Sequence, residues 1–254
     1  MSFSKRYEQW KRDTGSHGNM AKNRYVMLLF LEALNEQSQD FVFKGGNLLW
    51  HYIKSERPTT DLDLATDVEM EISQVIETIE NLRVDGVTFK IAQAEEIRQN
   101  GKIGAALQIA FKTEDGAVNK FGIDVVFAVP THTALVRMIT KEIKAASMEN
   151  IILDKVSACH RFKGGNTRMK DYDDLFRIAE SGTEIRPLVL VELARARGID
   201  LKLDQSIADD LESEYSKYLG YKANKGAKTL PRTISELIEI VNVFLMDVTK
   251  LAQR

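Results

Sequence analysis

The sequence predicts an α+β protein in which a small mixed β-sheet flanked by helices is followed by an all-helical C-terminal region. Short β-branched, aromatic or alternating segments lie before Pro130, and such segments are typical of strands. After Pro130 the apolar residues recur at helical spacing. In addition, a chain of 254 residues of which 44% are hydrophobic can bury the core of one or two domains.

The first half is expected to alternate helices with short strands. Asp115-Gly116 lies between the last two strands and predicts a hairpin. Thr66 and Glu69 have the spacing of a capping box, which predicts that a helix begins there. The expected strands are 41–43, 61–64, 87–92, 105–113 and 118–129, and the expected helices are 21–35, 48–53 and about 68–82.

The second half is expected to contain helices alone. Thr233 and Glu236 form a capping box at the start of the last one. We therefore expect two domains, residues 1–135 and 136–254, with the first twenty or so residues as a candidate tail. The helical domain is expected to complete the active-site cleft. The expected helices are 133–144, 149–162, 169–181, 188–197, 205–219 and 234–252.

Composition excludes several classes of protein. The formal net charge of −2 argues against a protein that coats polyanions, since such binding needs many cations. Cys159 is the one cysteine, so it predicts a packed core thiol and excludes a disulfide framework or a multi-cysteine metal site. The longest apolar run, 25–31, is too short to span a bilayer. We expect a cytoplasmic protein without membrane contact.

Three aspartates form the central chemical pattern. Asp61 and Asp63 lie two residues apart in an expected strand, so their carboxylates share one face. Asp124 lies in a strongly apolar strand, where a charge is costly without a partner. Hard oxygen ligands at fixed separation suit Mg²⁺ or Mn²⁺. Solvated acids on an edge strand, or an outward residue of a one-sided sheet, remain alternatives.

A glycine pair follows the expected strand 41–43. Gly45 and Gly46 precede a helix that starts near Asn47. Backbone N–H groups and the positive end of the helix dipole at such a turn form a phosphate cradle. A glycine pair alone also fits an ordinary turn, so the interpretation depends on the pair standing in order with the three aspartates.

A lysine and an aspartate in the helical half complete the pattern. Lys155 falls in the apolar stripe of its helix, where it either snorkels to water or reaches an anion. The segment 155–170 holds five Lys or Arg and no Asp or Glu, which favours an anion site. Asp171 shares a helix face with Leu175 and Ile178, so it is expected to point inward. Its alternative, purely structural roles are to cap the start of its helix or to pair with Lys155 or Arg168.

These elements, taken in order, resemble the polymerase-beta-like nucleotidyltransferase superfamily. Within it, residues 41–64 and 153–178 are similar to the AbiEii/AbiGii-type nucleotidyltransferase toxins of abortive-infection systems. Many relatives have Gly-Ser where this chain has Gly45-Gly46, so a phosphate contact of that serine would pass to the backbone or to Asn47. The likeness is carried by Lys44-Gly45-Gly46, Arg57 to Leu64, Lys155 with Arg161, and Lys170 to Leu175.

The resemblance implies a nucleotidyltransferase core and transfer of a nucleoside monophosphate from an NTP to an acceptor hydroxyl. It implies that Asp61, Asp63 and Asp124 hold the metal, with Lys155 and Asp171 also in the catalytic centre. The nucleotide-binding residues that it implies are Lys44, Gly45, Gly46, Asn47, Thr59, Thr60 and Arg161.

The resemblance also implies a growth-arresting toxin that serves phage defence and is neutralised by an antitoxin encoded nearby. We expect a monomer, with the 3′ end of tRNA as the favoured acceptor. A protein or small-molecule acceptor remains open, as does a metal-dependent nuclease, because nucleases also use clustered carboxylates.

Overall fold

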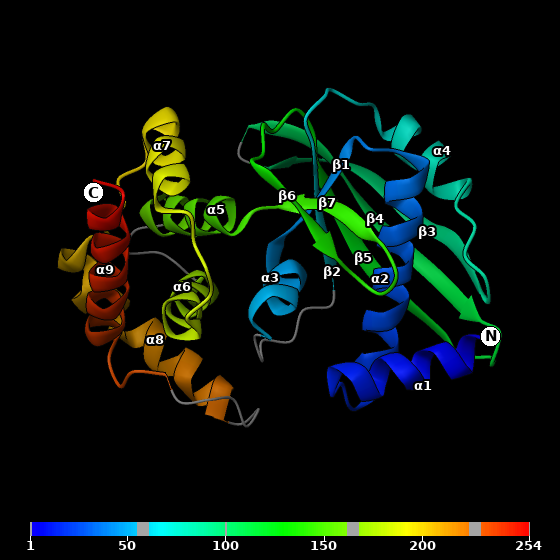
Figure 1. Cartoon of the computed structure of the whole chain (residues 1–254), viewed down its shortest axis with the longest axis horizontal. Helices are drawn as coiled ribbons and strands as arrows, with labels where there is room; N and C mark the ends of the chain where they lie inside the picture. Colours follow the sequence, from blue (N-terminus) through cyan, green and yellow to red (C-terminus); the bar gives the residue numbers. More distant parts are fainter. Residues whose placement is uncertain (1, 55–60, 100, 162–167, 224–229, 254) are drawn as a thin grey trace. The chain divides into compact units, whose positions relative to one another are not determined.

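The computed structural model describes residues 2–54, 61–99, 101–161, 168–223 and 230–253. They form two compact units. One unit comprises Met1–Leu48 and Pro58–Ala146, and the other comprises Leu49–Arg57 and Ser147–Arg254. The predicted α+β class and the helical C-terminal region are confirmed (Figure 1). None of the described helices is both long and apolar enough to cross a membrane.

The first unit is built on one mixed sheet. Within the described residues the sheet has seven strands in the order β3-β4-β5-β2-β1-β7-β6. The strands are β1 (Phe41–Lys44), β2 (Asp61–Thr66), β3 (Val87–Gln99), β4 (Lys102–Thr113), β5 (Val118–Val126), β6 (Thr133–Arg137) and β7 (Glu142–Ala146).

The centre of the sheet has one apolar and one polar face. In β2, Leu62 and Leu64 are buried, whereas Asp61 is exposed and Asp63 is half-buried. Strand β2 pairs antiparallel with β1 and parallel with β5. Side chains alternate between the two faces of a strand, so the leucines anchor the core and the aspartates lie on the opposite face.

Helices α2 (Asn19–Gln37) and α4 (Ile72–Glu80) cover the apolar face (Figure 1). Phe30 of α2 packs edge-to-face on Phe89 of β3 and Phe121 of β5, at centroid distances of 5.3 and 5.4 Å. Aromatic pairs favour this geometry. The core of the unit therefore lies on one side of the sheet, and the aspartate face lies on the other.

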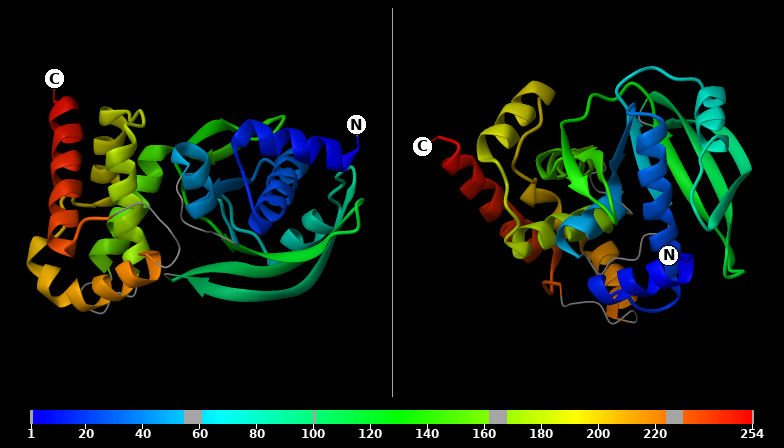
Figure 2. Two further views of the ribbon diagram at one scale, coloured as in Figure 1. Left: turned by 90° about the horizontal axis from the view of Figure 1, so that it is seen from below. Right: turned by 45° about the vertical axis from the view of Figure 1, so that its right-hand side comes forward.

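The N-terminal residues are a docked helix rather than a tail. Helix α1 (Phe3–Thr14) lies across the end of α2 (Figure 2). Its residues Phe3, Tyr7 and Trp10 are buried, and all three rings pack against Tyr25 of α2. The expected tail over the first twenty residues is therefore corrected, since three aromatic side chains hold the segment down.

The predicted start of the helix after β2 is also corrected. Thr66 is the last residue of β2, and its hydroxyl donates to the carbonyl of Val68 instead of capping a helix. Helix α4 begins at Ile72, where Glu71 and Gln74 form the capping box. The predicted capping box of Thr66 and Glu69 is therefore wrong, and the helix begins five residues later than predicted.

The largest correction concerns residues 133–144, for which the sequence predicts a helix. They form strands β6 and β7 with a turn between them, and β7 pairs parallel with β1. The sheet therefore runs to Ala146, and the expected boundary between residues 135 and 136 falls inside the β6–β7 hairpin. The two units instead divide at Ala146/Ser147, and residues 49–57 join the helical one.

The second unit is helical throughout its described residues, as predicted. Helix α5 is its centre, since ten of its residues are buried, and a helix that is buried almost all round lies in a core. The capping box of Thr233 and Glu236 is confirmed at the start of α9. The helices are α5 (Met148–Arg161), α6 (Met169–Ser181), α7 (Pro187–Arg197), η1 (Gln205–Ile207), α8 (Ala208–Ala223) and α9 (Ile234–Leu251).

Candidate active site

Strand pairing brings the three aspartates of the first unit side by side. Asp63 lies directly opposite Asp124 in the parallel pair of β2 and β5, and Asp61 lies opposite Gly122. On the other side, Lys44 of β1 lies opposite Asp63. Asp63 and Asp124 are half-buried and Asp61 is exposed. The predicted adjacency of residue 124 to residues 61 and 63 is confirmed, although their roles remain predictions.

Two glycines give these carboxylates their space. A Cβ on Gly45 would overlap Oδ2 of Asp63, and a Cβ on Gly122 would lie 2.6 Å from Oδ1 of Asp61. Gly45 also has φ +76°, a backbone conformation that glycine adopts without steric cost. Both carboxylates of the Asp-x-Asp pair therefore pack over a glycine backbone.

The glycine pair starts a helix directly after β1, as predicted. Helix α3 (Gly45–Ile53) follows β1 without a loop. Asn47 in its first turn is buried, and its Nδ2 donates to the carbonyl oxygen of Asp61 at 2.7 Å. The side-chain amide of Asn47 thus joins the start of α3 to the start of β2. The backbone N–H groups of the first turn of α3 are the groups that could donate hydrogen bonds to an anion.

A hollow of about 310 Å³ lies on the same face of the sheet. It extends from the aspartates across β5 and β4 to β3. Asp61 and Asp124 line it together with two glutamines and a third acid that no sequence motif indicated. The lining residues are Asp61, Gln93, Glu95, Ala106, Leu107, Gln108, Gly122 and Asp124.

The donor set suits a hard divalent cation. Carboxylate oxygens are the ligands that Mg²⁺ and Mn²⁺ prefer, and the glycines leave the Asp61 and Asp63 oxygens room beside the backbone. Among the described residues, however, no three His, Cys, Asp or Glu side chains are gathered around a common point. The strands thus place the three aspartates next to one another, but their carboxylates do not converge on one point.

The predicted residues of the helical unit form a buried ion cluster. Nζ of Lys155 on α5 lies 2.8 Å from Oδ1 of Asp171 and 2.6 Å from Oδ2 of Asp174, both on α6. Nε of Arg168 lies 2.8 Å from Oδ2 of Asp171. Burial acts to lower the pKa of Lys155, but Asp174 and Asp171 outweigh it and raise the pKa to about 12. Lys155 is therefore a charged lysine with two carboxylates against it.

A second buried cluster lies on the next face of α6. Asp173 is fully buried, and Nε of Arg177 lies 2.5 Å from its Oδ1. From α8, Nζ of Lys222 and the hydroxyl of Tyr218 lie 2.8 and 2.6 Å from its Oδ2. The acidic run of α6 thus links α5 on one side and α8 on the other. Removing one partner of such a buried pair is costly.

The remaining predicted residues are placed as follows. Arg161 is exposed in the last turn of α5. Thr59 and Thr60 lie outside the described residues, as does most of the basic segment between Arg161 and Arg168. Cys159 is buried, and burial raises the pKa of its thiol. The prediction of a packed core thiol is confirmed.

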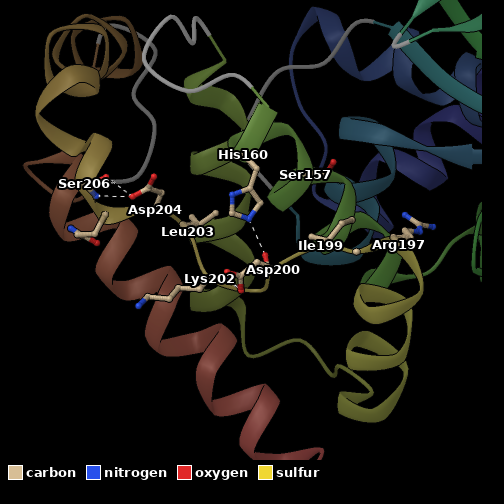
Figure 3. Close-up of a pocket in the computed structure, with 11 residues that line it drawn as sticks. Ser157, His160, Arg197, Ile199, Asp200, Lys202, Leu203, Asp204 and Ser206 are labelled. Carbon is tan, nitrogen blue, oxygen red and sulfur yellow. Dashed lines mark hydrogen bonds between the residues drawn. The ribbon is translucent and has the colours of Figure 1, made fainter.

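The helical unit has a hollow of its own, of about 740 Å³ (Figure 3). It lies between the end of α5 and the segment from α7 to η1. Nε2 of His160 lies 2.9 Å from the carbonyl oxygen of Asp200, and Asp204 accepts from the backbone and hydroxyl of Ser206. None of the predicted site residues that the structure describes lines it.

Sequence reasoning missed Gly122 and the three polar residues of the first hollow. A glycine inside the apolar strand 121–127 was a usable signal, because glycine in a strand often marks a close approach. Gln93, Glu95 and Gln108 gave no such signal. They join the site through strand register, which the sequence does not display.

The sheet, the aspartates opposed across β2 and β5 and the glycine-led helix are the features on which the sequence resembles the nucleotidyltransferases. Residues 29–226 match the family described as "Nucleotidyl transferase AbiEii toxin, Type IV TA system". Since the match spans more than three quarters of the chain, this protein belongs to that family of nucleotidyltransferase toxins. The predicted family and enzyme class are confirmed.

Solved structures support the fold. A protein from H. pylori described as a nucleotidyltransferase superposes with a TM-score of 0.61 at 16% identity, covering 94% of this chain and 98% of that one. JHP933 from Helicobacter pylori superposes with a TM-score of 0.61 at 17% identity, covering 94% and 95%. Among curated proteins there is no significant match.

Proposed function

We propose that this protein moves a nucleoside monophosphate from an NTP to a hydroxyl at an RNA 3′ end, with tRNA favoured, and that pyrophosphate leaves. The observation that carries the proposal is the strand register. It sets Asp63 opposite Asp124, with Asp61 two residues along the same face. Phosphoryl chemistry depends on positioning and charge neutralisation rather than on a protein nucleophile, and this face supplies fixed carboxylates for that purpose.

The first turn of α3 would hold the outer phosphates of the NTP. Its backbone N–H groups follow directly from Gly45 and Gly46, beside the Asp63 carboxylate. Free N–H groups and the helix dipole at an N-terminus attract anions. Lys44 lies opposite Asp63 in the sheet and would add a positive charge. Gly46 carries no hydroxyl, so the backbone makes the contact that a serine makes in many relatives.

Asp61, Asp63 and Asp124 would hold a divalent cation, Mg²⁺ or Mn²⁺. Such an ion, when bound, neutralises phosphate charge and lowers the pKa of the attacking hydroxyl. The carboxylates themselves orient the reacting groups, and Asp124 is the candidate to accept the proton of the acceptor hydroxyl. The roles that the resemblance implies for Lys155, Arg161 and Asp171 stay predictions, since within their own unit Lys155 is held by Asp171 and Asp174.

Family membership also supports a partner. A Type IV toxin belongs to a toxin–antitoxin pair, so we propose a cognate antitoxin encoded nearby and a role of the pair in phage defence. The activity would then arrest growth when the protein is expressed without that antitoxin. Growth arrest that disappears in a variant lacking an aspartate of the site would tie the toxicity to the transfer reaction.

The transfer reaction can be tested directly. The purified protein is incubated with each α-labelled NTP, Mg²⁺ and total cellular RNA, and the RNA is then resolved on a gel. We expect wild type to label RNA of tRNA size. Asp63→Asn should reduce labelling by roughly 10²- to 10³-fold, the effect of removing one group that stabilises charge in the transition state.

Asp67→Asn is the matched control. Asp67 follows β2 directly, but its carboxylate pairs with Lys144 at 2.9 Å at the surface, so its loss should leave labelling within about 2-fold. Label found on protein or on a small molecule would replace the RNA acceptor. RNA cleavage without any triphosphate would replace the transferase by a nuclease. Labelling that survives Asp63→Asn would overturn the site.

A further inference from the structure

The edge strand β3 contains one extra residue beside the aspartate face. Its pairing with β4 runs from Val87 opposite Thr113 to Ile91 opposite Ile109, and then resumes with Gln93 opposite Gln108. Ala92 is therefore a β-bulge. A bulge shifts every later side chain of its strand to the other face of the sheet.

This shift decides which side chains join the aspartate face. Past the bulge, Gln93 lies opposite Gln108 and Glu95 lies opposite Ala106. Gln108 and Ala106 in turn lie opposite Gly122 and Asp124 of β5. If the pairing continued past Ile91 without a bulge, Ala92 and Ala94 would take these places. The bulge thus replaces two methyl groups with an amide and a carboxylate next to Asp61 and Asp124.

The resulting hollow has an unusual charge for an enzyme that acts on nucleotides. Three carboxylates and two amides line it, and no described lining residue is Lys, Arg or His. Carboxylates repel phosphate, so the hollow does not suit a triphosphate or a phosphodiester. Glutamine amides both donate and accept hydrogen bonds. They suit sugar hydroxyls and base edges, which unpaired RNA ends expose.

The hollow and the first turn of α3 lie on opposite sides of β2. The first turn of α3 follows β1, on one side of β2, whereas the hollow lies over β5, β4 and β3 on the other side. In phosphoryl transfer the attacking and leaving oxygens lie roughly in line. If the outer phosphates leave toward α3, the attacking hydroxyl comes from the hollow.

Building on the proposed transferase function, we propose that Gln93, Glu95 and Gln108 form an acceptor subsite that receives the terminal nucleoside of the RNA. The amides and the carboxylate bind the ribose and the base, while the preceding phosphodiester stays outside. A volume of about 310 Å³ is at the small end for ligand pockets, roughly 300–1,000 Å³. It therefore takes one nucleoside, and the enzyme distinguishes acceptors by their last nucleotide.

The test uses short RNAs that differ only in the 3′-terminal nucleotide, and one that ends in a 2′-deoxynucleotide. Steady-state transfer is measured with the preferred labelled NTP. We expect wild type to distinguish these ends. Gln93→Ala and Gln108→Ala should each raise the acceptor KM by about 3- to 10-fold, because each change removes one hydrogen bond. Each should also reduce the discrimination between the 3′-terminal nucleotides. The KM for the NTP should not change.

Glu95→Gln and Glu96→Gln form a matched pair, since the two exposed glutamates are adjacent on β3 and Glu96 points to the other face. Only Glu95→Gln should change acceptor KM or discrimination. Thermal unfolding of each variant shows that it is folded.

The outcomes separate this inference from the function on which it rests. An acceptor KM unchanged in all three subsite variants, or a rise in the KM for the NTP instead, overturns the acceptor subsite while the transferase stands. Preferential labelling of a cationic amino-sugar over every RNA also overturns the subsite. Failure of wild type to label any acceptor overturns the proposed function as well.

Discussion

At the scale of single residues, the absence of a side chain is as important to the site as the carboxylates. Gly122 lies opposite Asp61, and any Cβ there would meet the carboxylate at its outer oxygen. The contact would be with the flexible end of a side chain rather than with backbone, so the fold can absorb it. The position of the Asp61 carboxylate cannot be kept.

Gly122→Ala should therefore separate activity from stability. We expect the free energy of unfolding to stay within about 1 kcal/mol of wild type. The kcat/KM for nucleotide transfer should fall by about 100-fold, because a displacement of about 1 Å in the Asp61 carboxylate is enough for a loss of that size. Urea unfolding and the transfer assay measure the two quantities on the same preparation.

Gly220→Ala is the matched control, because Gly220 lies in α8 and, among the described residues beyond its own stretch of helix, no atom lies within 4 Å of the added methyl group. It should stabilise the protein by up to about 1 kcal/mol and leave transfer unchanged. Full activity in Gly122→Ala would mean that the position of Asp61 does not matter for the reaction.

Residue patterns in the sequence predicted the three aspartates of the site, but not the polar residues that lie beside them. The spacing of Asp61 and Asp63 and the apolar surroundings of Asp124 are visible in the sequence. Gln93 and Glu95 are ordinary polar residues of an edge strand, and they reach the site through the bulge at Ala92. Likewise, the helical stripe placed Lys155 in the interior, but its second carboxylate, Asp174, is known only from the structure.

At the scale of elements, the β6–β7 hairpin shows what the sequence did not display. Its turn is closed by Glu32 of α2, which is buried. Oε1 of Glu32 accepts from the backbone N–H groups of Ile139, Thr140 and Lys141 at 2.6 to 2.9 Å, and Oε2 accepts from the Thr140 hydroxyl. A contact across more than a hundred residues leaves no local pattern, so the spacing within residues 133–144 predicts a helix instead.

Glu32→Ala should destabilise the protein by roughly 2–3 kcal/mol, because three backbone N–H groups of the turn lose a buried, charged acceptor. Glu36→Ala is the comparison one turn along α2. It pairs with the side chain of Lys141 at the surface and should cost less than about 1 kcal/mol. Chemical unfolding measures both, and equal losses would refute the capping role of Glu32.

A second carboxylate joins two helices of the other unit. Glu149 in the first turn of α5 is buried, and it accepts from the backbone N–H, Nε and Nη2 of Arg186 at 2.9, 3.1 and 2.8 Å. Arg186 is the residue that precedes Pro187 at the start of α7. Burial alone would raise the pKa of Glu149, but its hydrogen bonds, chiefly those from Arg186 and Ser147, together outweigh burial and lower the pKa to about 2.

This pair makes stability depend on acidity. Since the pKa of Glu149 is lower in the folded state than its ordinary value of 4.5, its contribution is complete above about pH 4.5. The contribution is lost as the pH falls toward 2. We expect wild type to lose roughly 2–3 kcal/mol more than Glu149→Gln across this window. Unfolding curves from pH 5 to 2 measure the difference, and parallel curves would contradict it.

At the scale of the whole molecule, the order of the motifs along the chain said more about the fold and the family than any single motif did. The class, the helical second half and the strand–glycine–helix unit followed from local patterns. The sheet order, the end of the first unit at Ala146 and the docked helix α1 depend on long-range pairing and aromatic packing. Such contacts connect distant residues, so a single sequence does not reveal them.

The proposed reaction requires that the carboxylates of β2 and β5 act as one site. The most direct measurement is Mn²⁺ affinity, by electron paramagnetic resonance with a non-transferable NTP analogue, for wild type, Asp63→Asn, Asp124→Asn and the double variant. If the carboxylates share a cation, each single change removes most of the affinity and the double variant is no worse. Wild-type affinity in Asp124→Asn, or losses that add independently, would contradict a shared site.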